Sequence, residues 1–198
     1  MIMMATIIAA VGYYDCTQGY LQCDPNIDFP GISSVMGLAP WNKLYSIMLT
    51  IYSYTRQAEA RAYHHRLNGI ASSLVQNLML AATVLSCVFG PCIGYFDKYY
   101  DSPTHGQVTK MFVIGEVAYI LLIIGVVNSN RDKFPNDGAS IDTLVTCRLI
   151  TIAIGVIQAL TTGVVNTWCE WAAFYMAFYI HYQLSTFMRY KMVVVADK

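Results

Sequence analysis

The chain has 198 residues, of which 56% are hydrophobic and only 12% are charged, and its formal net charge at pH 7 is zero. Soluble domains usually carry about 25% charged residues, so roughly half of the usual charge is missing. The sequence contains no basic cluster, no zinc-ligand spacing and no glycine-rich phosphate loop, which argues against nucleic-acid-binding and nucleotide-binding proteins. We therefore expect no nucleic-acid partner, no bound metal and no cofactor.

Four long segments are almost free of charged side chains. They are residues 67–96, 149–165 and 171–188, which have none, and residues 111–130, which have only Glu116. A helix needs about 20 apolar residues to cross a hydrocarbon core of ~30 Å. Strands of a transmembrane barrel instead alternate apolar and polar residues over segments of ~10 residues, and these runs are continuously apolar. The pattern predicts an all-α fold, a polytopic transmembrane helical bundle.

We expect about six helices in a single transmembrane domain that spans residues 1–198. In chain order they lie near 2–14, 43–64, 70–96, 108–128, 142–165 and 169–189. Proline and glycine break the chain between them, in loops at 15–42, 97–107 and 129–141. The first segment lacks the basic region and cleavage pattern of a signal peptide, so we interpret it as a short first membrane helix. A cleaved signal remains the alternative.

Lysine and arginine are distributed unequally between the two sides of such a bundle. One side would carry Arg66, Arg131, Lys133, Arg189, Lys191 and Lys198, and the other only Lys43 and Lys98, with Lys110 at a membrane edge. The positive-inside rule then makes both termini cytoplasmic. Loops 15–42 and 97–107 are predicted to be luminal, and loop 129–141 cytoplasmic.

Three of the six cysteines, Cys16, Cys23 and Cys169, fall on the predicted luminal side, where disulfides can persist. A bond between Cys23 and Cys169 would fasten the first loop over the bundle. Cys16–Cys23 is the local alternative, and free thiols throughout are the third possibility.

The segment from Cys23 to Pro40 carries a set of short motifs. Cys23-Asp-Pro precedes a pattern P-x-I-S-x-x-M-G-x-x-P that ends at Pro40, and a helix with arginines follows. Further matches are Asn77-Leu78, His105, Arg148-Leu149 and Cys169-Glu170. In these residues the chain resembles the Frag/DRAM/Sfk group of six-helix membrane proteins, and within it the post-GPI-attachment-to-proteins factor two branch. The resemblance covers nearly the whole chain and favours the Cys23–Cys169 pairing.

The resemblance implies a multi-pass protein of the Golgi or endoplasmic reticulum that acts in lipid remodelling of GPI anchors, as an enzyme or as an obligatory partner of one. Membrane lipids and possible further membrane subunits are the implied partners. Other branches of the group regulate autophagy or organise lipid kinases. A non-enzymatic scaffold, or an accessory subunit of a larger membrane complex, is therefore the alternative function.

Charged side chains at membrane depth are costly, so each is a candidate functional residue. Arg56 and Glu59 are three residues apart and can pair on one helix face. Arg56 could instead receive a lipid phosphate, because its planar guanidinium suits bidentate contacts. Arg61 and Arg148, together with Asn77 from the matched motif, complete the candidate lipid-binding residues. A purely structural role is the alternative for each.

His105 and Glu170 form the one combination that resembles an acid–base pair. Both are predicted at the luminal surface, where a histidine oriented by a carboxylate could act as a general base in acyl transfer. Contact with a lipid headgroup and a role in loop structure are the alternatives. His64, His65 and His181 are not expected to bind metal, because adjacent histidines on a helix point to different faces.

Overall fold

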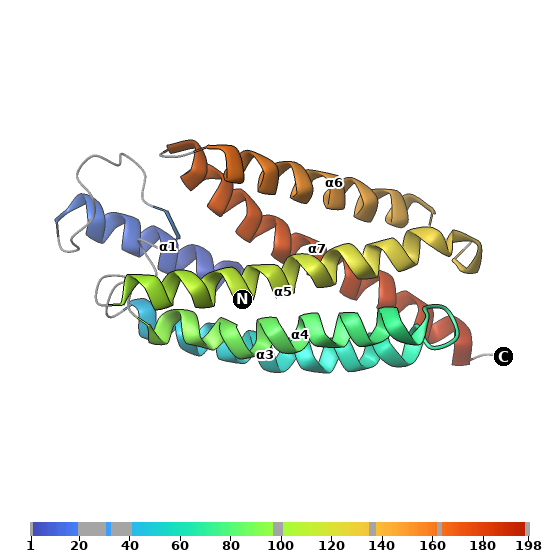
Figure 1. Ribbon diagram of the computed structural model, residues 1–198. Coiled ribbons are helices and arrows are strands. Elements are labelled where there is room, and N and C mark those ends of the chain that lie inside the picture. Colours follow the sequence, from blue (N-terminus) through green and yellow to red (C-terminus); the bar gives the residue numbers. More distant parts are fainter. Residues whose placement is uncertain are drawn as a thin grey trace.

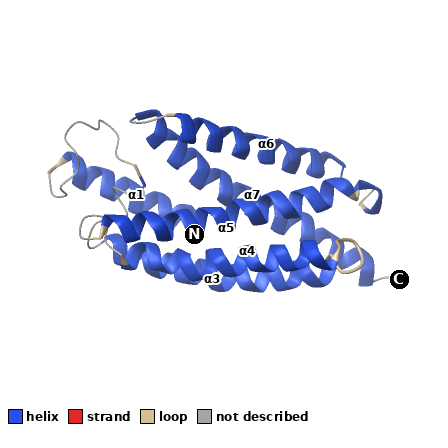
Figure 2. Ribbon diagram, viewed as in Figure 1, coloured by secondary structure: helices blue, strands red, loops and turns tan. Residues whose placement is uncertain are grey.

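The computed structural model describes residues 2–19, 31–32, 41–96, 101–134, 138–161 and 164–196. These residues contain six α-helices, one short 3-10 helix and no strand, which confirms the all-α helical fold (Figures 1 and 2). The helices are α1 (Ile2–Thr17), α3 (Trp41–Arg66), α4 (Ser73–Tyr95), α5 (Ser102–Ser129), α6 (Gly138–Leu160) and α7 (Val164–Ala196), and the 3-10 helix η1 covers Arg131–Lys133.

Helix α5 begins earlier than the sequence pattern predicts. The loop was expected to continue to residue 107, but Asp101 caps the helix, and its carboxylate accepts a hydrogen bond of 3.3 Å from the Thr104 amide. Pro103 follows in the first turn, where a missing N–H costs nothing. His105 therefore lies on a helix and not in a loop.

The boundary between the last two helices was also predicted wrongly. Helix α6 ends at Leu160 and α7 starts at Val164, whereas we expected the connection to lie at 166–168. Helix α7 then continues to Ala196, beyond the expected end at 189. Hydropathy does not locate this turn, because the residues on both sides of it are uncharged.

Three helices are long and apolar enough to cross a membrane, namely Ser73–Tyr95, Pro103–Ser129 and Ser140–Leu160. They identify the chain as a membrane protein. Helix α1 has 16 residues, fewer than the ~20 that a crossing requires, and it begins near the middle of the bundle (Figure 1). The six crossings and the cytoplasmic termini stay predictions.

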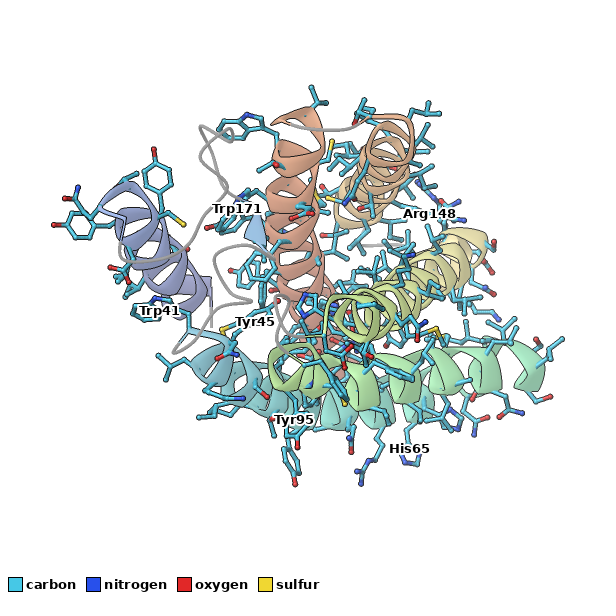
Figure 3. The ribbon with its side chains drawn as sticks, turned by 60° about the vertical axis from the view of Figure 1, so that its left-hand side comes forward. Trp41, Tyr45, His65, Tyr95, Arg148 and Trp171 are labelled. Atoms are coloured by element: carbon cyan, nitrogen blue, oxygen red, sulfur yellow. The ribbon has the colours of Figure 1, made fainter. Side chains whose placement is uncertain are left out.

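The helices form two groups (Figures 1 and 3). Helices α3, α4 and α5 pack side by side as one layer, and α6 packs mainly on α7. Helix α1 is attached to both groups. The Trp41 indole donates a hydrogen bond of 3.0 Å to Asp15, and the hydroxyls of Thr6 and Tyr175 lie 3.3 Å apart.

Glycines allow close contacts within the three-helix layer. A Cβ on Gly115 of α5 would lie 2.7 Å from both the Ala82 carbonyl oxygen and the Ser86 amide nitrogen of α4. A Cβ on Gly94 of α4 would collide with the Asn42 carbonyl oxygen of α3. Membrane helices associate through such small residues, because lipid supplies no hydrophobic driving force between them.

Two apolar clusters fill the bundle. One lies near the end at which α3 and α5 begin, which we call the His105 end, and it contains Tyr45, Ile93 and Trp171. The larger cluster extends to the opposite end and includes the fully buried Ile123 and Leu184. This distribution leaves a polar site between the clusters.

Replacement of Gly115 by alanine should lower the stability of the purified protein, because the new methyl group meets backbone atoms that cannot rotate away. Overpacking of this kind costs about 1–3 kcal/mol. Gly155→Ala on α6 is the matched control, since nothing lies within 4 Å of its Cβ position. Thermal unfolding in detergent should show a lower midpoint for Gly115→Ala and an unchanged or higher one for Gly155→Ala. Equal midpoints would contradict the close α4–α5 contact.

Candidate functional site

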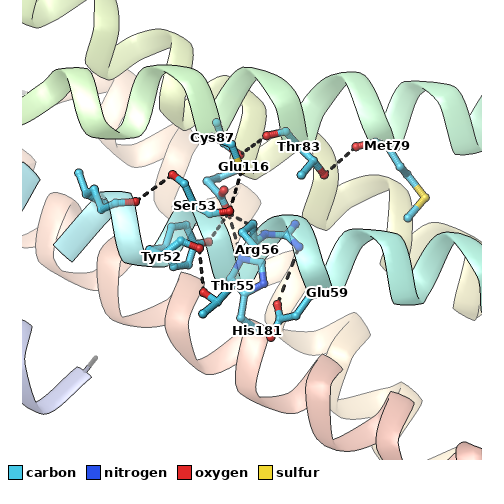
Figure 4. Close-up of polar contacts among 12 residues, drawn as sticks. Tyr52, Ser53, Thr55, Arg56, Glu59, Met79, Thr83, Cys87, Glu116 and His181 are labelled. Atoms are coloured by element: carbon cyan, nitrogen blue, oxygen red, sulfur yellow. Dashed lines mark hydrogen bonds and ion pairs between the residues drawn. The ribbon is translucent and has the colours of Figure 1, made fainter. Parts of the chain in front are cut away.

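Glu116 is the centre of a buried polar network in the middle of the bundle (Figure 4). Its Oε2 atom accepts a hydrogen bond of 2.8 Å from the Tyr52 hydroxyl. The same atom lies 2.9 Å from Nε2 of His181, which donates to it. Because the three residues belong to α5, α3 and α7, this one carboxylate joins the three-helix layer to the α6–α7 pair.

Arg56 carries a charge that is almost completely buried, with 1% of its side chain exposed. Its Nε lies 3.9 Å from Oε2 of Glu116, and its Nη1 lies 3.9 Å from Oε2 of Glu59. The guanidinium also stacks on Tyr119, 3.7 Å from the ring centre, a favourable cation–π distance. The expected pairing with Glu59 is present, and Glu116 and Tyr119 complete the environment of the arginine.

A cavity of ≈ 240 Å³ lies beside this network, between the three-helix layer and the α6–α7 pair. Its walls are mostly apolar, with Leu49, Phe112, Ile120 and Phe174 among them. The polar residues that line it are Tyr45, Tyr52, His105, Thr109, Glu116, Thr151, Gln158 and Glu170. Both members of the predicted acid–base pair, His105 and Glu170, thus line the same cavity.

His105 is 5% exposed and is held by the main chain. Its Nδ1 lies 2.8 Å from the Phe96 carbonyl oxygen, and its Nε2 has no hydrogen-bond partner in the described part of the chain. We expected the carboxylate of Asp97 or Asp101 to orient this ring, and Asp97 lies outside the described residues. Instead, a backbone carbonyl does so, because the Asp101 side chain caps α5.

Part of the proline-rich first loop reaches the same cavity. Ile32 lines it, and a Cβ on Gly31 would lie 2.7 Å from Oε2 of Glu170. A larger residue at this position would require the flexible Glu170 side chain to move. Ile32, a residue of the motif that carries the family resemblance, therefore lies at the cavity wall.

The other predicted lipid-binding residues lie away from the cavity. Arg61 is exposed on α3 and borders a small groove with His64 and His65, near the opposite end of the bundle. Asn77 is exposed on α4. Arg148 is half-buried on α6, facing α5, where its Nη1 would lie 3.4 Å from a Cβ on Gly125 (Figure 3). The structure therefore does not unite these residues with His105 and Glu170.

The predicted Cys23–Cys169 bond is wrong. Cys169 is a free, buried thiol within helix α7. Cys16 is disulfide-bonded. Cys23 lies outside the described residues.

Sequence reasoning missed His181 and Tyr52 as members of the network. His181 was considered only as a metal ligand, and no metal-binding group of three or more His, Cys, Asp or Glu side chains occurs in the described part of the chain. The signal that could have found it is its depth in an otherwise uncharged segment, where a polar side chain needs a partner from another helix.

Comparisons with protein-family models, with curated proteins and with solved structures find no match. The resemblance to the Frag/DRAM/Sfk group therefore rests on the residues quoted above.

Substitutions of Arg56 and Glu116 should be strongly coupled. Either Arg56→Met or Glu116→Gln alone removes one partner of a buried ion pair, a change that typically costs about 3–5 kcal/mol. The double variant removes both charges and should be more stable than the two single effects predict when added. Thermal unfolding in detergent, followed by tryptophan fluorescence, gives the stability of the native chain, the two single variants and the double variant. Arg61→Met, at an exposed position, should have little effect, and additive single effects would show that the pair is not coupled.

Proposed function

We propose that this protein binds a membrane lipid in the cavity between the three-helix layer and the α6–α7 pair, and that it acts in the lipid remodelling of GPI anchors. The observation that carries the proposal is the shape and lining of the cavity. It combines apolar walls with polar groups at the His105 end, the arrangement that an amphiphilic molecule requires.

The extent of the cavity along α5 agrees with an acyl chain. Its lining runs from His105 to Ile120 on that helix. At a rise of 1.5 Å per residue this stretch covers about 22 Å, comparable to most of a hydrocarbon core of ~30 Å. A lipid with its headgroup near His105 and Glu170 would place its chain against Phe112 and Ile120.

Two features support a role in acyl transfer or in its assistance. A histidine whose Nδ1 is fixed by a carbonyl presents Nε2 as a proton acceptor, which is what a general base needs. The lining residues that carry a hydroxyl are Tyr45, Tyr52, Thr109 and Thr151, and no serine or cysteine is found among the described ones. The attacking hydroxyl would then belong to a threonine of the cavity, to the lipid or to a partner protein, so both the enzymatic role and the obligatory-partner role fit the site. Residence in the Golgi or endoplasmic reticulum belongs to this proposal.

The scaffold function remains the second candidate because α6 is mostly exposed. Its apolar outer side chains include Leu149, Ile152, Val156, Ile157 and Leu160. Lipid tails can cover such an apolar surface, and so can the transmembrane helix of another subunit. Co-purification of a stable membrane partner in mild detergent, lost on substitution of these residues, would favour the scaffold.

Cells that lack the protein should carry GPI anchors with an altered fatty-acid composition or with accumulated lyso-GPI. Mass spectrometry of the anchor lipids measures this change. Reintroduced His105→Ala protein should fail to restore the normal lipids, since it lacks the proton acceptor. His65→Ala is the matched control, because His65 is exposed on the outer side of α3, and it should restore them (Figure 3).

The result distinguishes GPI remodelling from other functions, and a catalytic role of His105 from a different role. Unchanged anchors in the deletion would remove GPI remodelling as the function. If the deletion alters the anchors and His105→Ala protein restores them fully, the protein acts in GPI remodelling but His105 is not catalytic.

A further inference from the structure

His105 offers the cavity an acceptor and not a donor. A carbonyl oxygen can only accept, so the proton of the neutral ring lies on Nδ1, which donates to Phe96. Nε2 is then a bare acceptor, buried at the cavity wall without a partner in the described part of the chain. Buried polar atoms in proteins nearly always have a hydrogen-bond partner, so this atom calls for a donor from elsewhere.

Two further residues continue the same face of α5. Thr109 is four residues after His105, and Glu116 is seven after Thr109, spacings that place all three on one side of a helix. Oγ1 of Thr109 and Oε1 of Glu116 are also buried without a hydrogen-bond partner among the described residues. We call His105, Thr109 and Glu116 the α5 polar stripe. It presents two acceptors and one hydroxyl along an otherwise apolar wall.

The charge of the lining has one sign. Glu116 and Glu170 both line the cavity, while none of the described lining residues is a lysine or an arginine. Arg56 lies beside Glu116 but does not line the cavity, so it cannot pair with an anionic group there. A phosphate inside would face carboxylates and bare acceptors, and it would lose its hydration without gaining donors. The earlier idea that Arg56 receives a lipid phosphate does not fit this arrangement.

Building on the proposed lipid binding, we propose that the cavity selects lipids whose headgroup donates hydrogen bonds to the α5 polar stripe through hydroxyl or ammonium groups, and that it discriminates against a headgroup with only a phosphate. Sugar hydroxyls and a primary ammonium group share this donor chemistry. The carboxylate of Glu170, near the His105 end, adds a further acceptor for such a group.

Native mass spectrometry of the purified full chain tests the selectivity. The protein in detergent is exposed to three lipids with identical acyl chains: a galactosyl diacylglycerol, which has hydroxyls and no phosphate, a phosphatidylethanolamine, and a phosphatidic acid. The galactolipid should be retained at least tenfold better than phosphatidic acid. Retention of the ethanolamine lipid above phosphatidic acid would identify ammonium as a suitable donor, and equal retention of the two would restrict the site to hydroxyls.

Conservative variants connect the selectivity to the stripe. His105→Asn keeps an amide that can donate to the Phe96 carbonyl but lacks the Nε2 acceptor, and Thr109→Val removes a hydroxyl at constant shape. Each should weaken galactolipid binding about fivefold to tenfold, the effect of one hydrogen bond. Thr146→Val is the control, because Thr146 is exposed on α6 and its hydroxyl bonds only to its own helix.

The outcomes distinguish this inference from the function on which it rests. Equal or preferential binding of phosphatidic acid, or variants that bind galactolipid like the native chain, would overturn the donor-headgroup selectivity and leave lipid binding intact. Failure of all three lipids to bind would overturn both the selectivity and the proposed lipid binding.

Discussion

The buried charge of Arg56 is the constraint on which the arrangement of the helices depends. A guanidinium with 1% exposure in an apolar bundle is tolerated only if charges and a polarisable surface surround it. Glu59 on its own helix supplies one charge, but that carboxylate is one-third exposed and cannot suffice. Glu116 and Tyr119 must therefore come from α5, and this requirement fixes the position of α5 relative to α3.

The same carboxylate then determines where α7 lies. Glu116 accepts hydrogen bonds from both Tyr52 and His181, so α7 is attached to the layer through a polar contact at this level. Toward the opposite end the helices pack through Ile123, Ile180 and Leu184, which are almost completely buried. Toward the His105 end α7 and α6 lie further from α5, and the cavity occupies the space between them. The polar network thus marks the transition from a filled core to an open one.

The sequence predicted most of the fold and little of the site. Long uncharged segments determine helices through the length of the bilayer core, and all six expected spans begin within about six residues of the observed helices. The network depends on contacts such as His181–Glu116, which are 65 residues apart, and no local pattern encodes them. The Cys23–Cys169 prediction was wrong because it rested on the predicted luminal side and on the family resemblance, and neither determines the distance between two thiols. His105 and Glu170 line one cavity because α5 and α7 both begin at that end of the bundle, whereas the sequence pattern placed His105 in an exposed loop and not on a buried helix turn.

Glu116 belongs to both the network and the cavity, and this sharing has a thermodynamic consequence. Its Oε2 atom holds Tyr52 and His181, while Oε1 has no hydrogen-bond partner in the described part of the chain and the residue lines the cavity. A headgroup that donates to Oε1 would complete the hydrogen bonding of a carboxylate that already joins three helices. Any ligand that binds only the folded state stabilises it, and here the stabilisation would act on the residue that attaches α7 to the layer. Occupancy of the cavity and the association of the two helix groups are therefore expected to be coupled through this one side chain.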